Sequence, residues 1–248
     1  MTNSVHDAPV QGRGAQYLLA NTQAVAHAFD GCGELLTLRP QQRLPRSKIQ
    51  SGGLFAIREG LLALDVIPPG GHRQILDFLM SGDVVPAPGF VFPQSFSIRA
   101  ITPSVVMCRS GAGASAWPSG EVHIDLFLAQ CYSRLARRNI HQIMIGQLDT
   151  ESRVASFLLS LALRRGEALG ATHLLELPMS RDDIADYLAI NHDTLSRIMM
   201  RSEMMGLIRR VNRHSVHLTD IEGLGRRTPI GSMLLTVFAR PPAPETHS

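Results

Sequence analysis

One stretch decides the fold of this chain: Arg181-Asp-Asp-Ile-Ala-Asp-Tyr-Leu-Ala-Ile-Asn-His-Asp-Thr-Leu-Ser-Arg-Ile198. Its apolar residues recur at helical spacing on both sides of a three-residue turn. They are Ile184, Leu188, Ile190, Leu195 and Ile198. Small Ala185 stands where two helices would cross closely. The pattern predicts a helix-turn-helix whose second helix lies in the major groove of DNA.

The second helix divides into a packing face and a polar face. Leu195, Ile198 and Met205 are expected to pack. The predicted base-reading residues occupy positions i, i+1, i+4 and i+5 of the opposite face, namely His192, Asp193, Ser196 and Arg197. An arginine can donate two parallel hydrogen bonds to guanine, and a carboxylate can accept one from cytosine. The alternative is an ordinary helical hairpin with a solvated charged face.

Further polar residues around the motif are suited to DNA phosphates, which fix the position of a protein but not the sequence it reads. We predict this role for Ser180, Thr194, Arg201 and Arg213. The net charge is only +3, but seven arginines stand against three acidic residues between Arg197 and Arg227. This distribution favours double-stranded DNA as a partner.

A single long helix is predicted over Glu121–Gln147, which contains no proline and has its one glycine near the end. One seam of this helix steps by three and four residues. Its apolar members are the predicted dimer interface: Ile124, Leu128, Cys131, Leu135 and Ile145. Such a homodimer would place two reading helices ~34 Å apart over an inverted repeat. The alternative is a helix packed on its own barrel, and one helix can do both.

The region Leu35–Thr102 consists of short apolar segments separated by glycine and proline clusters, which predicts an antiparallel barrel. Within it, Phe96–Ile101 alternates as a half-buried strand does, with Arg99 on the polar side. Downstream, a helix over Asp149–Arg165, a short strand over Leu174–Leu177 and a hairpin around 211–214 predict a winged helix-turn-helix. Asp149 or Thr150, Ser180 and Asn191 are expected N-caps, and Gly206 is expected to stop the second helix.

The predicted class is therefore α+β. It comprises an N-terminal antiparallel jelly-roll barrel, a long dimerisation helix and a C-terminal winged helix-turn-helix. The expected boundaries are a disordered arm at 1–15, the barrel at 16–120, the dimerisation helix at 121–148, the DNA-binding domain at 149–227 and a loose tail at 228–248.

Composition narrows the class of protein. The longest apolar run, about Ala155–Leu163 and interrupted by serine, is far below the ~18 residues of a membrane span, and the N-terminus lacks a secretory pattern. We therefore expect a cytoplasmic protein with no membrane partner. The three cysteines, Cys32, Cys108 and Cys131, form no C-x-x-C pair, so a disulfide framework, a zinc site and an iron–sulfur cluster lack support. No metal site and no cofactor are expected.

Over residues 30–225 the chain resembles the Crp/Fnr superfamily of bacterial transcription regulators, and most closely its FixK-like branch. The resemblance is carried by Leu177–Leu188 with Asp193-Thr-Leu-Ser-Arg197, by Asp149–Leu159, and in the barrel by Phe55–Gly60 and Phe78–Asp83. It implies a sensor-like jelly roll, a dimer helix and a winged helix-turn-helix. In Fnr-like branches a Glu, a Ser and an Arg read a TTGAT-type half-site. The matching residues here are Asp193, Ser196 and Arg197, so the acid is one methylene shorter.

The resemblance also bears on effectors. Cyclic-nucleotide binders carry Gly-Glu followed by Arg-Ser or Arg-Thr, whereas Gly82-Asp83 and Gln94-Ser95 stand here. No arginine is left to pair with a cyclic phosphate, so cyclic AMP is not expected. The Fnr branch holds an iron–sulfur cluster through an N-terminal cysteine cluster, which Cys32 alone cannot supply. Heme bound through His72 or His123 remains the alternative.

Together these features predict a homodimeric transcription regulator, an activator in low-oxygen or nitrogen-oxide metabolism, with RNA polymerase as a further partner. The alternative within the family is a sensor gated by heme or another small molecule. A cupin-type barrel enzyme would need a set of histidine and glutamate ligands, but the apolar segments from Leu54 to Ile101 include only His72. We therefore expect no enzyme and no catalytic residue.

Overall fold

The computed structural model describes residues 33–50, 53–68, 71–86, 96–110, 121–164 and 173–238, and for 121–130 the helical backbone only. The predicted arm at 1–15, Cys32 and Gln94-Ser95 lie outside the described residues, as do the side chains of His123, Ile124 and Leu128. In the part that is described, no helix combines the length and apolar character needed to cross a membrane.

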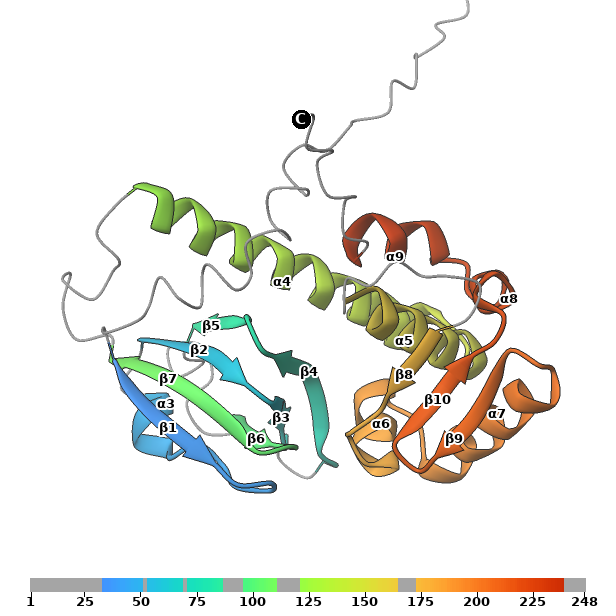
Figure 1. Ribbon diagram of the computed structural model, residues 1–248, viewed down its shortest axis with the longest axis horizontal. Helices are drawn as coiled ribbons and strands as arrows, with labels where there is room; N and C mark the ends of the chain where they lie inside the picture. The colour runs from blue at the N-terminus through green and yellow to red at the C-terminus, as the bar shows by residue number, and fades with distance from the viewer. Residues whose placement is uncertain are drawn as a thin grey trace, which may run out of the picture.

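The N-terminal part is built from two antiparallel sheets (Figure 1). One has the order β1-β7-β2-β5, with β1 at Glu34–Leu38, β7 at Ser104–Ser110, β2 at Gly53–Glu59 and β5 at Val84–Pro86. The other has the order β4-β3-β6, with β4 at Gln74–Met80, β3 at Leu61–Val66 and β6 at Phe96–Ala100. A short helix, α3 (Arg46–Gln50), follows β1. The short apolar segments expected as strands within Leu35–Thr102 correspond to β2 to β6, whereas β1 and β7 carried no specific prediction.

Apolar side chains from both sheets fill the space between them. Phe55, Leu62 and Ile98 are among the buried residues of this cluster. At the β2–β3 turn, Gly60 adopts a φ of +89°, and a Cβ there would lie 2.4 Å from the backbone oxygen of Pro103. The turn between these strands therefore requires glycine.

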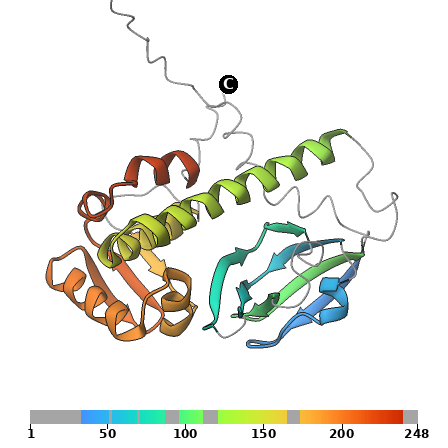
Figure 2. The same ribbon diagram turned by 180° about the vertical axis from the view of Figure 1, so that it is seen from behind.

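A long helix joins the two halves of the molecule. α4 (Glu121–Gln147) runs across the barrel and on to the C-terminal unit, as Figures 1 and 2 show from opposite sides. α5 (Thr150–Arg164) follows at once and is almost entirely buried. The side chain of Asp149 accepts a hydrogen bond from the amide of Ser152 at 2.8 Å, which confirms it as the N-cap and lowers the pKa of its carboxyl.

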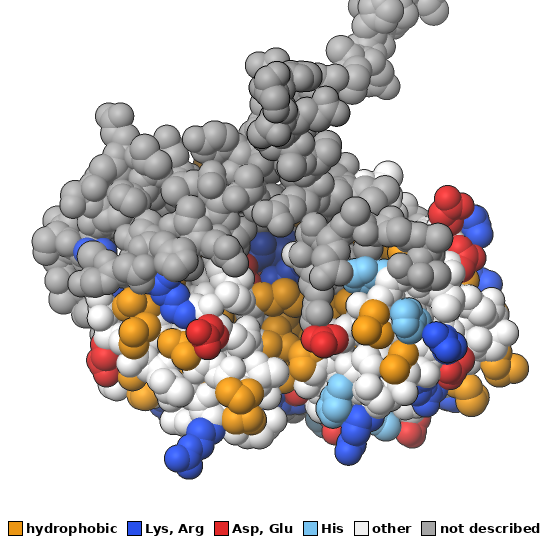
Figure 3. Space-filling view, in the orientation of Figure 1, with side chains coloured by type: hydrophobic (Ala, Val, Ile, Leu, Met, Phe, Trp, Pro, Cys, Tyr) orange, Lys and Arg blue, Asp and Glu red, His pale blue; other side chains and the backbone are white. Residues whose placement is uncertain are grey.

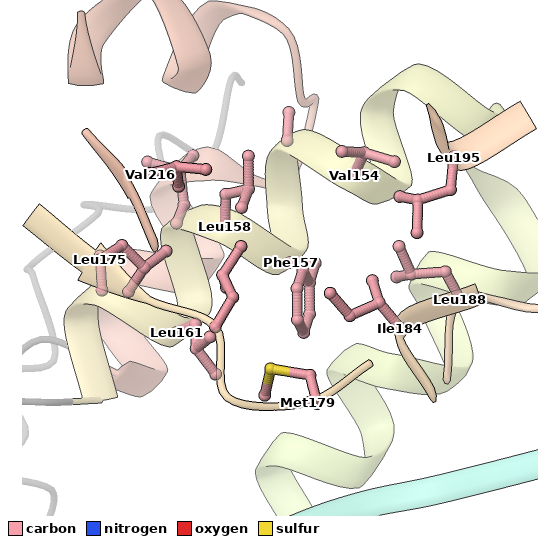
Figure 4. Packing of buried hydrophobic residues seen from close by; sticks show 14 of the residues in the cluster. Val154, Phe157, Leu158, Leu161, Leu175, Met179, Ile184, Leu188, Leu195 and Val216 are labelled. Carbon is pink, nitrogen blue, oxygen red and sulfur yellow. The ribbon is translucent and has the colours of Figure 1, made fainter. Parts of the chain in front are cut away.

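The C-terminal unit packs around α5. It contains β8 (His173–Glu176), α6 (Arg181–Leu188), α7 (His192–Met204), β9 (Ile208–Asn212) and β10 (Ser215–Leu218), with the sheet order β8-β10-β9. Figure 4 shows Phe157 of α5 at the centre, with Ile184 and Leu188 of α6 and Leu195 of α7 directed toward it. The expected helix-turn-helix with a β-hairpin wing is confirmed.

Two sequence expectations are wrong. Arg99 is expected on the polar side of a half-buried strand, but it is buried, because Asp183 of α6 and Gln41 both contact its guanidinium group. The segment after residue 227 was expected to be a loose tail, but α8 (Ile221–Arg226) is followed by α9 (Gly231–Phe238), which contacts α4 and α5. Leu234 of α9 is fully buried, and this burial holds the helix in place despite the glycine and proline around it.

Candidate DNA-binding interface

Local hydrogen bonds define both helices of the motif. The Ser180 hydroxyl accepts from the amide of Asp183 at 3.0 Å, and Asn191 Oδ1 accepts from the amide of Thr194 at 2.7 Å. Between them Ala189 adopts a left-handed φ of 52° and ends α6. Gly206, at a φ of +71°, lies just beyond α7. The predicted caps at Ser180 and Asn191 and the stop at Gly206 are confirmed.

One side of α7 packs against the rest of the C-terminal unit. Leu195, Ile198, Met199 and Ser202 are buried. Met205 was expected on this side but is exposed, because the helix ends at Met204 and Met205 serves as its C-cap. Met199 takes the packing role instead.

The four predicted base-reading residues lie together on the exposed side of α7. His192, Asp193, Ser196 and Arg197 are all exposed, and the side chain of Asp193 is 92% exposed. Arg197 is only loosely held by its own helix, since Nε donates to the Asp193 carbonyl at 3.4 Å and Nη2 donates to Thr194 Oγ1 at 3.3 Å. Its guanidinium can therefore turn to another acceptor at small cost.

The four predicted phosphate-contacting residues are less uniform. Arg213 is exposed in the turn between β9 and β10, and Ser180 is exposed although its hydroxyl caps α6. Thr194 is half-buried in the first turn of α7. Arg201 is exposed but forms an ion pair with Glu151 of α5. In Figure 3, arginine and histidine side chains gather over the C-terminal unit.

Comparison with known proteins identifies the architecture. The model of the Crp-like helix-turn-helix domain matches residues 152–227. The nitrogen fixation regulation protein FixK of Azorhizobium caulinodans is 32% identical over 179 residues, which cover 70% of this chain and 70% of that protein. This chain belongs to the Crp/Fnr family of DNA-binding transcription regulators.

Two more matches agree with this assignment. The nitrogen fixation regulation protein FixK of Bradyrhizobium diazoefficiens is 31% identical over 160 residues, which cover 62% of this chain and 65% of that protein. The match thus spans just under two thirds of that relative. The structure of FixK2 from Bradyrhizobium japonicum has a TM-score of 0.66 at 21% identity, covering 79% of this chain and 97% of that one. This Crp/Fnr protein therefore has the same fold as FixK2.

Asp83, just before β5, forms ion pairs with two arginines of this chain. Arg137 of α4 and Arg164 of α5 donate to its two carboxylate oxygens at 2.9 and 3.0 Å. Burial alone would raise the pKa of Asp83, but Arg137 and Arg164, together with the Met80 amide and Arg134, outweigh burial and lower it. Asp83 therefore ties the barrel to the helices. His72 is exposed, and in the described part of the chain no three His, Cys, Asp or Glu side chains are grouped to hold a metal ion.

The first helix of the Crp/Fnr motif is held by the barrel, which sequence reasoning missed. Arg99 Nη2 of β6 donates to Asp183 Oδ1 at 2.6 Å, and both side chains are nearly fully buried. Arg73 donates to Asp183 and Asp186 at 2.8 and 2.7 Å. Asp183 and Asp186 belong to the first helix of the motif, and nothing in the sequence pairs them with arginines that lie 84 and 110 positions from Asp183.

Side chains also cap the carbonyl end of α6. Gln74 of the barrel donates to the Asp186 carbonyl, and Arg153 of α5 donates to the Leu188 carbonyl at 3.2 Å. His141 of α4 lies 2.6 Å from the Tyr187 carbonyl, which can only accept, so Nε2 carries the proton. Its ring stacks on that of Tyr187 at 4.1 Å between centroids. Barrel, α4 and α5 thus all fix this helix.

The faces of α4 bear on the predicted dimer interface. Ile140, Met144 and Leu148 are buried in the protein's own core, whereas Leu135 is exposed. Cys131 packs against a barrel cluster that includes Leu54 and Met107, and Ile145 is half-buried. Leu135 is therefore available for contact with a second subunit, whereas Cys131 already packs against the barrel of its own subunit.

The described cysteines are not activated thiols. Burial raises the pKa of Cys108 to about 11, and burial raises that of Cys131 as well. Because the thiolate is the reactive form, both are held in the unreactive thiol state near neutral pH.

Proposed function

We propose that this Crp/Fnr protein is a cytoplasmic homodimer that binds a TTGAT-like inverted repeat and activates genes of low-oxygen or nitrogen-oxide metabolism together with RNA polymerase. The observation that carries the DNA-binding part is the polar side of α7, where all four candidate reading residues are exposed. The two FixK relatives are named as regulators of nitrogen fixation, and a relative from Pasteurella multocida is named an anaerobic regulatory protein; these names motivate the physiological part.

In this proposal Arg197 binds guanine through O6 and N7, and Asp193 accepts a hydrogen bond from a cytosine amino group. Ser196 contacts a base edge, and so does His192, which lies at the N-terminal end of α7 where the helix enters the major groove. Ser180, Thr194 and Arg213 contact phosphates. Arg201 joins them only after leaving Glu151, an exposed pair that contributes little to stability.

The dimer proposal is supported by the open side of α4. Five exposed residues follow a repeat of three and four positions: Tyr132, Leu135, Asn139, Gln142 and Gly146. Leu128 stands one heptad before Leu135 and extends the same stripe, with Ile124 beside it. A lone asparagine in such a seam favours one register of a two-stranded parallel pair. In this refined proposal Cys131 and Ile145 flank the seam rather than form it.

We retain the proposed division into barrel at 16–120, dimerisation helix at 121–148 and DNA-binding domain from 149. The last domain is extended beyond 227 to include α9, because this helix packs on α5.

Selection of bound sequences from random DNA with the purified full chain tests the function. We expect an inverted repeat with a TTGAT-like half-site, and recovery of no preferred sequence would contradict the proposal. Leu135→Asp tests the dimer by sedimentation, with exposed Leu174→Asp on β8 as the matched control. Monomers are expected from the first variant only.

A further inference from the structure

Two methionines on the exposed side of α7 have no role in the proposed function so far. Met200 is 52% exposed and Met204 is 81% exposed. Neither belongs to the apolar face that packs on α5, which consists of Leu195, Ile198 and Met199. Since a helix repeats every 3.6 residues, Asp193, Arg197, Met200 and Met204 at i, i+4, i+7 and i+11 form one continuous stripe. The reading face thus continues as an apolar ridge.

We propose that Met200 contacts the 5-methyl group of a thymine in the major groove and so helps to determine which sequence is bound. This inference rests on the proposed function. A methionine offers a base edge no hydrogen-bond donor, and the apolar group that the major groove displays is the thymine methyl. The flexible thioether adapts to such a group.

The spacing along the helix fits this contact. Met200 lies three residues beyond Arg197, which is about 4.5 Å along the helix axis. Neighbouring base pairs are ~3.4 Å apart. Met200 therefore reaches a base about one step from the one that Arg197 contacts. Met204 lies another turn away, where a helix that enters the groove by its N-terminus has begun to leave it.

The surroundings of the ridge favour DNA over a protein partner. Arg197 precedes it on the same stripe, and exposed Arg201 lies beside it. Arg210 of β9 is exposed, and its backbone amide donates a hydrogen bond to the side chain of Glu203 on α7 at 2.9 Å. Two methionines set among arginines suit an anionic groove with isolated apolar groups. A stable protein interface needs about 800 Å² on each side, far more than these two side chains supply.

Replacing thymine by deoxyuridine tests the contact, because it removes the methyl group and nothing else. The selected site is titrated with the full chain, one position of the half-site at a time. At one position the wild-type protein is expected to bind about fourfold more weakly, the loss that corresponds to one buried methyl group. Met200→Ala should bind the two DNAs equally at that position. Met204→Ala, which changes the same residue type on the same stripe, should keep the fourfold difference.

Each other outcome is decisive. Equal sensitivity to deoxyuridine in wild type and Met200→Ala would overturn the inference, as would no sensitivity at any position. If Met200→Ala lowers transcription with RNA polymerase but leaves DNA binding and deoxyuridine sensitivity unchanged, the ridge serves a protein partner and the inference is wrong. Failure of the proposed function looks different, because wild-type protein would then show no preferred site at all.

Discussion

The two helices of the helix-turn-helix use the same charged residue in opposite ways. Asp183 of α6 is 4% exposed and lies against Arg99 and Arg73 of the barrel, whereas the side chain of Asp193 of α7 is 92% exposed. A desolvated carboxylate depends on its partners, but an exposed one is free to meet a ligand. In the proposed function, α6 therefore positions the motif and α7 contacts the DNA bases.

The largest expected effect comes from removing the buried acid. Asp183→Ala leaves the buried Arg99 guanidinium without its closest partner, so we expect a loss of about 3–5 kcal/mol in the free energy of unfolding. Asp193→Ala should change that free energy by less than about 0.5 kcal/mol. Urea denaturation of both variants measures the difference, and similar losses would break the distinction between the helices.

Arg197→Ala should act on recognition alone. Removing its paired hydrogen bonds to guanine is expected to cost about 1–3 kcal/mol of discrimination between the selected site and a scrambled one. The unfolding free energy should stay near that of the wild type, because the side chain is exposed. Titration at fixed salt and denaturation of the same sample separate the two quantities.

The pH dependence of the unfolding free energy should come from His141 of α4, whose side chain contacts the end of α6. Burial lowers the pKa of His141 below its ordinary value of 6.5, although its hydrogen bond to Tyr187 opposes this shift. The unfolded chain then binds the proton more readily, so stability is complete above pH 6.5 and declines as the pH falls below it. His141→Gln should flatten this decline in urea titrations between pH 7 and 5. An unchanged slope would remove His141 from the explanation.

The smallest effect is expected at the wing. Arg213→Ala should weaken binding to selected and scrambled DNA by the same factor and lower the slope of log affinity against log salt by about one. A change in sequence preference would mean that Arg213 reads bases.

Local pattern was sufficient for the helix-turn-helix, its N-caps and the long helix α4. Ser180 and Asn191 were identified as caps because capping depends on neighbours three residues away. The apolar period of α7 and the absence of proline in α4 are likewise local features, and each predicted its helix from neighbouring residues alone. The reading face followed directly, because a helix fixes which side chains share a side.

Contacts between distant segments could not be predicted. The alternation of β6 places Arg99 away from the barrel interior, which normally means solvent, but Asp183 of α6 and Gln41, both distant in the chain, contact Arg99 there. Asp183 and Arg99 are 84 positions apart, and no periodicity connects them. The packing of Leu234 on α9 likewise depends on helices far earlier in the chain.

The most direct test of the division between holding and reading compares the isosteric variants Asp183→Asn and Asp193→Asn. For each, the unfolding free energy and the affinity ratio between the selected and a scrambled site are measured under one condition. We expect Asp183→Asn to lose stability with an unchanged ratio at temperatures where it is folded. Asp193→Asn should keep its stability and change the ratio. The reverse result, or equal effects on both quantities, would contradict the account.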